Sequence, residues 1–190
     1  MQERKYVEAH HKLRSVEARP LLSTKHGLNL LGVCERALGN AHLAVQAYLL
    51  SLKIDANQSG VWTNLGNAYK DLNKLDSSIR CHSLADSMTG GNDAQIIHNM
   101  GISMALSNRH QEAISLFEKS ILINPDNLET NWDLARSQLA TFDYKNGWSN
   151  YKFRWNCKDV GSRRFNDIAW DGGNLAGKKV FVYLEQGFGD

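Results

Sequence analysis

The chain has 190 residues, of which 42% are hydrophobic and 22% are charged, an ordinary composition for a folded protein and too apolar for a disordered one. Its 22 lysines and arginines against 20 aspartates and glutamates leave a net charge of +2, too small to indicate nucleic acid or an anionic membrane surface as the main partner. Because no stretch approaches the roughly 20 apolar residues of a membrane span and the start lacks the apolar core of a secretory signal, we expect a cytoplasmic protein.

The first predicted element is a helix over residues 4–19, which we interpret as the second helix of an incomplete repeat. From about residue 22 to residue 158 a pattern then recurs. Its markers are a large apolar residue followed by a small one, at intervals of 34, 35 and 34 residues. The markers are Leu31-Gly32, Leu65-Gly66, Met100-Gly101 and Leu134-Ala135. Recurrence at this interval indicates a series of similar structural units.

Each marker lies within the first helix of a predicted helical hairpin. Trp62, Leu65 and Tyr69 follow the spacing of one helical face, which they share with Gly66. A glycine in mid-helix costs about 1 kcal/mol relative to alanine, so its recurrence indicates that another group approaches closely there. The predicted group is the side chain sixteen positions after the marker, on the second helix. This position holds Tyr48, His82, Phe117 and Tyr151.

The end of each first helix is also marked. Seven residues after the small residue of the first three markers stand Gly39, Asn73 and Asn108. All three are residue types that tolerate the left-handed backbone conformation in which helices commonly end. The pattern therefore predicts two antiparallel helices in each repeat.

Two stretches carry the motif of a known repeat family, namely Trp62-x-x-Leu65-Gly66-x-x-Tyr69 and Ala113-x-x-x-Phe117 followed by Pro125. They resemble the tetratricopeptide repeat. The resemblance implies an all-α fold, a right-handed superhelix of antiparallel helix pairs over residues 1–158, with half a repeat followed by about four repeats. It also implies that the first helices line a concave groove that binds a peptide or protein segment, without catalysis, cofactor or metal.

The groove positions of the family, carried over residue by residue, give eight candidate peptide-binding side chains: Asn29, Arg36, Asn64, Asn67, Lys70, Asn99, Asp133 and Arg136. An asparagine amide both donates and accepts hydrogen bonds, so it can hold an extended backbone without recognising side chains. Asn64 and Asn99 occupy equivalent positions in adjacent repeats, an arrangement similar to the asparagine ladder of O-linked N-acetylglucosamine transferase repeats. The alternative is that asparagine is simply common at this position in the family.

The chaperone-binding subgroup of the family clamps a C-terminal carboxylate with two asparagines and several cations. Asn67 and Asn99 match the asparagines of that clamp. Thr63, Glu129 and Asp133, however, stand where the clamp needs lysine or arginine. Two carboxylates at these positions would repel a carboxylate ligand, so we do not expect a chaperone adaptor of this kind.

Other residue patterns have simpler interpretations. The three cysteines are Cys34, Cys81 and Cys157, and without C-x-x-C spacing they indicate buried free thiols rather than disulfides or a zinc site. The seven histidines are scattered and suggest no metal site. Trp148, Tyr151 and Trp155 follow helical spacing, which predicts packing at the end of the last helix.

The character of the sequence changes after residue 158. Residues 170–178 are predicted to form a turn-rich linker, and residues 179–184 alternate in the way of a single strand. Gly187 and Gly189 follow that strand as an incomplete glycine-rich loop, of the kind that lets a backbone approach an anionic ligand. We therefore expect residues 159–190 to be a second unit made of a linker and one strand, which is either disordered, folded back on the last helix or paired with another copy.

This second unit has a resemblance of its own, carried by Gly147-Trp148, Tyr151, Arg154-Trp155, Trp170-x-Gly172, Leu175-x-Gly177-Lys178 and residues 185–190. These resemble the junction between tetratricopeptide repeats and a bacterial glycosyltransferase with two Rossmann domains (GT-B), similar to heptosyltransferases. The resemblance implies that residues 159–190 are the start of a truncated enzyme domain, in which one strand cannot bind a nucleotide-sugar.

Three hypotheses follow for the function. The first is a protein-binding module whose groove holds a peptide or protein segment. The second is that the module selects the protein acceptor for a parent glycosyltransferase. The third is a self-associating scaffold that pairs through the ends of the solenoid or through the C-terminal strand, since both expose unsatisfied surface.

Overall fold

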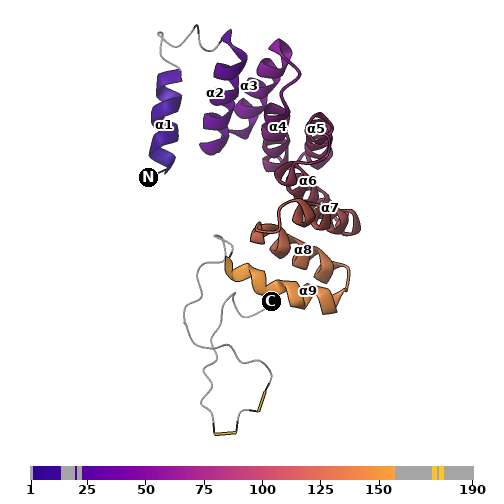
Figure 1. Ribbon diagram of the computed structural model, residues 1–190. Helices are drawn as coiled ribbons and strands as arrows, with labels where there is room; N and C mark the ends of the chain where they lie inside the picture. The colour runs from indigo at the N-terminus through magenta and orange to yellow at the C-terminus, as the bar shows by residue number, and fades with distance from the viewer. Residues whose placement is uncertain (1, 14–19, 21–22, 157–172, 175, 178–190) are drawn as a thin grey trace.

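The computed structural model describes residues 2–13, 20, 23–156, 173–174 and 176–177. Within these ranges every regular element is a helix (Figure 1). The elements are α1 (Gln2–Leu13), α2 (Lys25–Ala37), α3 (Ala41–Ile54), α4 (Ser59–Asp71), α5 (Leu75–Met88), α6 (Ala94–Leu106), α7 (His110–Ile123), α8 (Leu128–Ala140), α9 (Tyr144–Tyr151) and the 3-10 helix η3 (Lys152–Asn156). The predicted strand at residues 179–184, most of the linker before it, and Gly187 and Gly189 lie outside the described residues.

From α2 onward the helices form hairpins joined by short turns. The pairs are α2 with α3, α4 with α5, α6 with α7 and α8 with α9, and each pair packs on the next through α3 and α4, α5 and α6, or α7 and α8. The first helices of successive pairs also touch one another. Figure 1 shows the pairs following a curve that has α2, α4, α6 and α8 on its inner side. The predicted all-helical stack of helix pairs is therefore confirmed for the described residues.

The close approach predicted at the markers is confirmed in three repeats. A Cβ atom added at the glycine would lie 2.5 to 2.7 Å from the ring on the second helix, in the pairs Gly32–Tyr48, Gly66–His82 and Gly101–Phe117. The three rings are among the most deeply buried side chains of the protein. Because no side chain fits between ring and helix, only glycine lets the two helices cross at this distance.

The turns between paired helices use the left-handed backbone conformation. Gly39, Asn73 and Asn108 have φ angles of 83°, 56° and 58°, as their residue types predict. In the fourth pair the same place is taken by Phe142, with φ of 64° and a side chain that is 76% exposed. A bulky residue in this region costs roughly 1–2 kcal/mol, so sequence reasoning alone would not have placed a turn on it.

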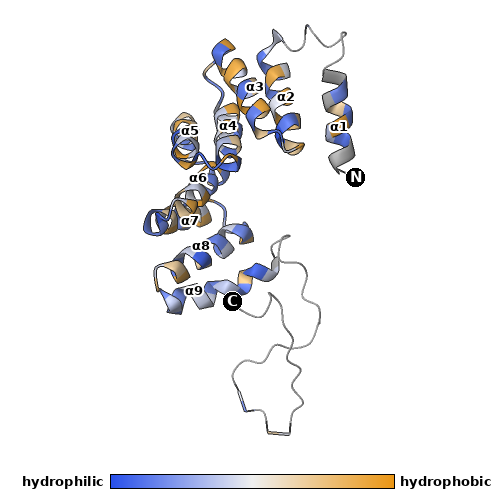
Figure 2. Ribbon diagram, turned by 180° about the vertical axis from the view of Figure 1, so that it is seen from behind, coloured by the Kyte–Doolittle hydropathy of each residue, from blue (hydrophilic) through white to orange (hydrophobic). Residues whose placement is uncertain are grey.

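The hydrophobic core is divided between the repeats. One buried cluster joins residues of α3, α4 and α5, and a second joins residues of α6, α7 and α8. Accordingly, Figure 2 shows hydrophobic residues spread along α2 to α7 rather than gathered at one place. Cys34 and Cys81 are buried free thiols, as predicted, whereas Cys157 lies outside the described residues.

The two ends of the stack are closed differently. At the start, α1 packs against α2 and covers part of the helix predicted over residues 4–19, of which residues 14–19 are not described. At the other end, the rings of Trp132 and Trp148 contact the ring of Tyr151 at centroid distances of 4.8 and 5.0 Å. The guanidinium of Arg154 lies over the rings of Tyr151 and Trp155. The predicted aromatic packing at the end of the last helix is therefore present.

The glycine markers can be tested within one helix. In Gly66→Ala the new Cβ would stand 2.7 Å from the His82 ring, so we expect the free energy of unfolding to fall by about 1–3 kcal/mol through overpacking. Gly60→Ala, also in α4, meets no atom within 4 Å and should be neutral or slightly stabilising. Urea denaturation measures both variants, and equal stabilities would contradict the close-approach explanation.

The ring of His82 predicts a dependence of stability on pH. It is fully buried, neither nitrogen has a hydrogen-bond partner among the described residues, and burial, followed by repulsion from Lys70 and Arg36, lowers its pKa to about 4. In the unfolded chain the pKa is about 6.5, so between these values only the unfolded state binds the proton. The free energy of unfolding should therefore fall as pH falls from about 6.5 to about 4, by an amount on the order of 3 kcal/mol.

His82→Phe places at this position the ring type of Phe117 and cannot take up a proton. We expect this variant to lose the His82 contribution, so that its unfolding free energy changes less with pH than that of the unaltered chain. Chemical denaturation between pH 4 and pH 7 gives the comparison. The same pH dependence in both proteins would show that His82 is not the group responsible.

Candidate functional site

The predicted binding side chains lie on the first helices of the four pairs. Asn29 and Arg36 are on α2; Asn64, Asn67 and Lys70 on α4; Asn99 on α6; and Asp133 and Arg136 on α8. These helices form the inner side of the curve (Figure 1). Because successive first helices touch, side chains from neighbouring repeats meet directly on this face.

Two polar contacts join α2 to α4. The Nε atom of Arg36 donates to Oδ2 of Asp71 over 2.6 Å, and its Nη2 atom donates to Oδ1 over 3.3 Å. About two helical turns away, Nδ2 of Asn64 donates to Oδ1 of Asn29 over 3.2 Å. Both contacts join residues 35 positions apart. They hold the first two repeats side by side and bring three predicted binding residues together.

The contact between α6 and α8 is more deeply buried. The Nε2 atom of His98 lies 2.9 Å from Oδ2 of Asp133, and these side chains are only 5% and 20% exposed. The other oxygen of Asp133 accepts a hydrogen bond from Nη1 of Arg136 over 3.3 Å. Asp133 is thereby satisfied on both oxygens, whereas the side chain of Arg136 is 62% exposed and has further donors to offer.

The middle of the inner face contains groups without partners in the described part of the chain. The Oδ1 atom of Asn67 is buried and accepts no hydrogen bond there. Lys70 forms no ion pair with any described residue. Its pKa is lowered, first by burial and then by the charge of Arg36, while Asp71 and Asp133 oppose the shift. A polar group of a bound molecule would relieve both the unsatisfied oxygen and the repelled cation.

Asn99 is placed less favourably than its sequence position suggests. It is only 8% exposed, and its Oδ1 atom accepts a hydrogen bond from Nε2 of Gln95 over 3.2 Å. The described contacts join Asn64 to Asn29 and give no direct bond between Asn64 and Asn99. Binding through a ladder of Asn64 and Asn99 therefore stays a prediction, in which Asn99 has little surface to present.

Sequence reasoning did not find the pairs Arg36–Asp71 and His98–Asp133. Each joins residues 35 positions apart in consecutive first helices. The spacing of 35 residues could have identified these pairs. It equals one 34-residue repeat plus one residue, and side chains at this separation meet when consecutive first helices lie side by side. A single repeat does not contain this signal.

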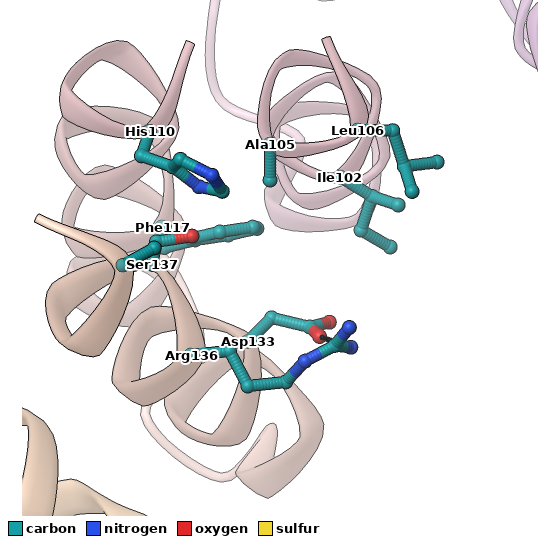
Figure 3. Close-up of a pocket in the computed structure, with 9 residues that line it drawn as sticks. Ile102, Ala105, Leu106, His110, Phe117, Asp133, Arg136 and Ser137 are labelled. Carbon is teal, nitrogen blue, oxygen red and sulfur yellow. Dashed lines mark hydrogen bonds and ion pairs between the residues drawn. The ribbon is translucent and has the colours of Figure 1, made fainter. Parts of the chain in front are cut away.

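Pockets on the described part of the protein include one at each end of the inner face. One, of 270 Å³, lies between α6, α7 and α8 (Figure 3). The other, of 290 Å³, lies between α1, α2 and α4, where Tyr6 faces the region of Arg36, Asn64 and Asp71.

Among the described residues no three histidine, cysteine, aspartate or glutamate side chains gather closely enough to hold a metal ion. None of the described helices has the length and apolar composition needed to cross a membrane.

Comparison with known proteins agrees with this architecture. Residues 59–86 and 94–127 match the family model of the tetratricopeptide repeat, so these two segments are tetratricopeptide repeats. The transcriptional activator NprA of Geobacillus stearothermophilus is 28% identical over 96 residues, covering 45% of this chain. The aligned region spans only 24% of NprA, about a quarter of that protein.

Solved structures show the same fold. MamA superposes with a TM-score of 0.66 at 18% identity, over 77% of this chain and 83% of MamA. The first tetratricopeptide-repeat domain of Spaghetti (RPAP3), bound to an HSP90 peptide, superposes with a TM-score of 0.60 at 19% identity, over 63% of this chain and 96% of that domain. At these identities the likeness establishes the helix-pair solenoid. The resemblance of the C-terminal segment to a glycosyltransferase junction stays a prediction.

The contacts of Asp133 and Asp71 predict different costs for two similar substitutions. Asp133→Ala leaves His98 buried without its partner, which we expect to lower the free energy of unfolding by about 1–3 kcal/mol. Asp71→Ala breaks an ion pair whose side chains are about one-third exposed, and such pairs contribute about 0–1 kcal/mol. Urea denaturation of the two variants measures the difference. A larger loss for Asp71→Ala would contradict the assignment of the buried contact.

Proposed function

We propose that this chain is a protein-interaction module that holds an extended peptide or protein segment along the inner faces of α2, α4, α6 and α8. The observation that supports this most strongly is a set of polar groups on this face that remain available for hydrogen bonds to a ligand. They are Oδ1 of Asn67, the ammonium of Lys70 and the exposed guanidinium of Arg136. A buried acceptor such as Oδ1 of Asn67 costs stability when it has no partner, and a ligand that donates to it gains binding energy. Lys70 and Arg136 can offer donors to the same ligand.

An extended segment suits the spacing of the inner helices. Neighbouring packed helices lie about 8–10 Å apart, and an extended chain advances about 3.3 Å for each residue, so a ligand passes one repeat about every three residues. Four inner helices then correspond to a segment of about ten residues. Asparagine amides and cations spaced in this way offer donors and acceptors to successive backbone groups of the ligand.

The HSP90 peptide bound by the Spaghetti repeat domain supports the proposal at the level of the fold. In this chain, Thr63, Glu129 and Asp133 stand at the positions where the family's carboxylate clamp needs cations. The ligand proposed here is therefore bound through Lys70 and Arg136, and not through cations at those three positions. Selection of an acceptor protein for a glycosyltransferase would use the same groove, with the acceptor segment as the ligand.

Self-association is a second candidate, and the C-terminal end of the stack supports it. Three aromatic side chains around α9 are largely exposed, namely Phe142, Tyr144 and Trp148. Exposed aromatic clusters of this kind are common at protein–protein contacts. This surface lies on the last helix pair, away from Lys70 on α4, so the two candidates involve different residues and can be separated.

The groove proposal is tested by selecting peptides of about ten residues from a random display library and measuring their affinities by isothermal titration calorimetry. We expect selected peptides to bind Lys70→Ala, and the double variant Asn64→Ala with Asn99→Ala, at least about tenfold more weakly. Ser83→Ala, an exposed residue of α5, serves as the control and should bind as the unaltered chain does.

Three outcomes decide between the candidates. Unchanged affinity for Lys70→Ala removes the groove proposal, and unchanged affinity for the double asparagine variant removes the asparagine ladder. Sedimentation velocity at several protein concentrations covers self-association. A dimer that Trp148→Ser abolishes, together with no selected peptide, would favour the scaffold.

A further inference from the structure

The pocket between α6, α7 and α8 arises from a change in the repeat pattern. Four residues after the marker glycine, the first two repeats carry the long cations Arg36 and Lys70, whereas the third repeat carries Ala105. The side chain that would fill this part of the inner face is therefore missing in the third repeat. Ala105 lines the pocket.

The facing helix contributes a second small residue. In the first two repeats the guanidinium of Arg36 is bound by Asp71, which stands five residues after its own marker. The residues that correspond to this pair between α6 and α8 are Ala105 and Ala140, and both line the pocket. Two methyl groups thus stand where an ion pair stands between α2 and α4. Space is left between the helices as a result.

The space has the size and surface for one apolar side chain. Its volume of 270 Å³ lies just below the roughly 300–1,000 Å³ of pockets that hold whole small molecules. The apolar residues around it are Ile102, Ala105, Leu106, Phe117 and Ala140. Figure 3 shows the ring of Phe117 between His110 on one side and the side chains of α8 on the other.

The polar groups at the pocket indicate which ligand group would lie next to that apolar side chain. Both oxygens of Asp133 are occupied, by His98 and Arg136, so the charge that would repel a carboxylate ligand at this position is offset in part by the Arg136 guanidinium. Arg136 donates one hydrogen bond to Asp133, and its exposed guanidinium has other donors available. A guanidinium recognises carboxylates well. On the α7 side, Nδ1 of His110 is buried without a partner among the described residues.

We propose that this pocket accepts a leucine-sized apolar side chain of a bound peptide segment, and that Arg136 binds the side-chain carboxylate of an adjacent acidic residue in that segment. The inference rests on the proposed groove function and deepens it, because it states which side chains the ligand carries over the third and fourth repeats. A side chain buried in a pocket and an arginine that binds a carboxylate are two kinds of contact that can each contribute strongly to binding.

The test uses small probes that reach the pocket without needing the rest of the groove. We would titrate N-acetyl-Leu-Asp-amide into the protein and follow the methyl resonances of Ile102 and Leu106 by NMR. We expect both resonances to shift and saturate. N-acetyl-Gly-Asp-amide, which lacks the apolar side chain, should bind at least about tenfold more weakly, and N-acetyl-Leu-Asn-amide should bind more weakly because it lacks the carboxylate.

Two variants close the pocket in different ways. Ala105→Arg with Ala140→Asp rebuilds the ion pair seen between Arg36 and Asp71, and Ala105→Leu fills the space with an apolar group. Both should abolish the probe-induced shifts, whereas Ser83→Leu on α5 should leave them unchanged. Because the two fillings differ in charge, failure of one variant to fold leaves the other as the test.

The outcomes separate this inference from the proposed function. Equal affinity for the Leu and Gly probes, unshifted methyl resonances, or shifts that persist in folded filled-pocket variants would overturn it. Library-selected peptides that need Lys70 but ignore Ala105→Leu would leave the groove function standing and remove the pocket. Saturable binding of the Leu-Asp probe without any selected peptide would support the pocket and remove the groove function. Methyl shifts that follow protein concentration alone would assign the pocket to a second copy of the chain and contradict the proposal.

Discussion

The contact between a ring and a glycine within each of the first three helix pairs is the interaction on which the rest of the structure depends. A large side chain of the second helix lies against the glycine of the first, closer than any Cβ atom would allow. This contact lets each pair bury its apolar residues between its own helices and those of its neighbours, so that the core is distributed along the stack. The inner faces of the first helices are therefore available for polar contacts.

Those polar contacts divide the inner face into satisfied and unsatisfied positions. Arg36 with Asp71, and His98 with Asp133, bind neighbouring first helices to each other across the repeat boundary. Between them, Asn67 and Lys70 remain unpaired with described residues, and Lys70 is disfavoured further by burial and by the charge of Arg36. The same face that stabilises the curve thus keeps binding capacity at its centre. At the third repeat boundary small residues replace the charged pair and a pocket takes its place.

Much of this arrangement could be predicted from the sequence because it is repeated. The marker glycines, the large residues sixteen positions later and the left-handed turns at Asn73 and Asn108 each recur at one interval, and local helical geometry explains their spacing. The remainder depends on how one repeat lies against the next. The partner of Asp133, the burial of Asn99 and the space left by Ala105 are set by the register between first helices of different repeats, which no single repeat encodes. Phe142 shows the limit of residue preferences, because it adopts the left-handed conformation that glycine and asparagine adopt in the other turns.

The proposed function requires that a polypeptide ligand lies along the inner faces of the first helices. Paramagnetic relaxation enhancement tests it most directly, with a nitroxide attached to a selected peptide and amide resonances recorded for the whole chain. If the peptide lies on the inner face, broadening will be strongest on α4, α6 and α8, along the side that carries Asn67 and Arg136, and weak on the outer sides of α5 and α7. Broadening concentrated on α5 and α7, or on the exposed end of α9 alone, would contradict the claim that the inner face is the binding surface.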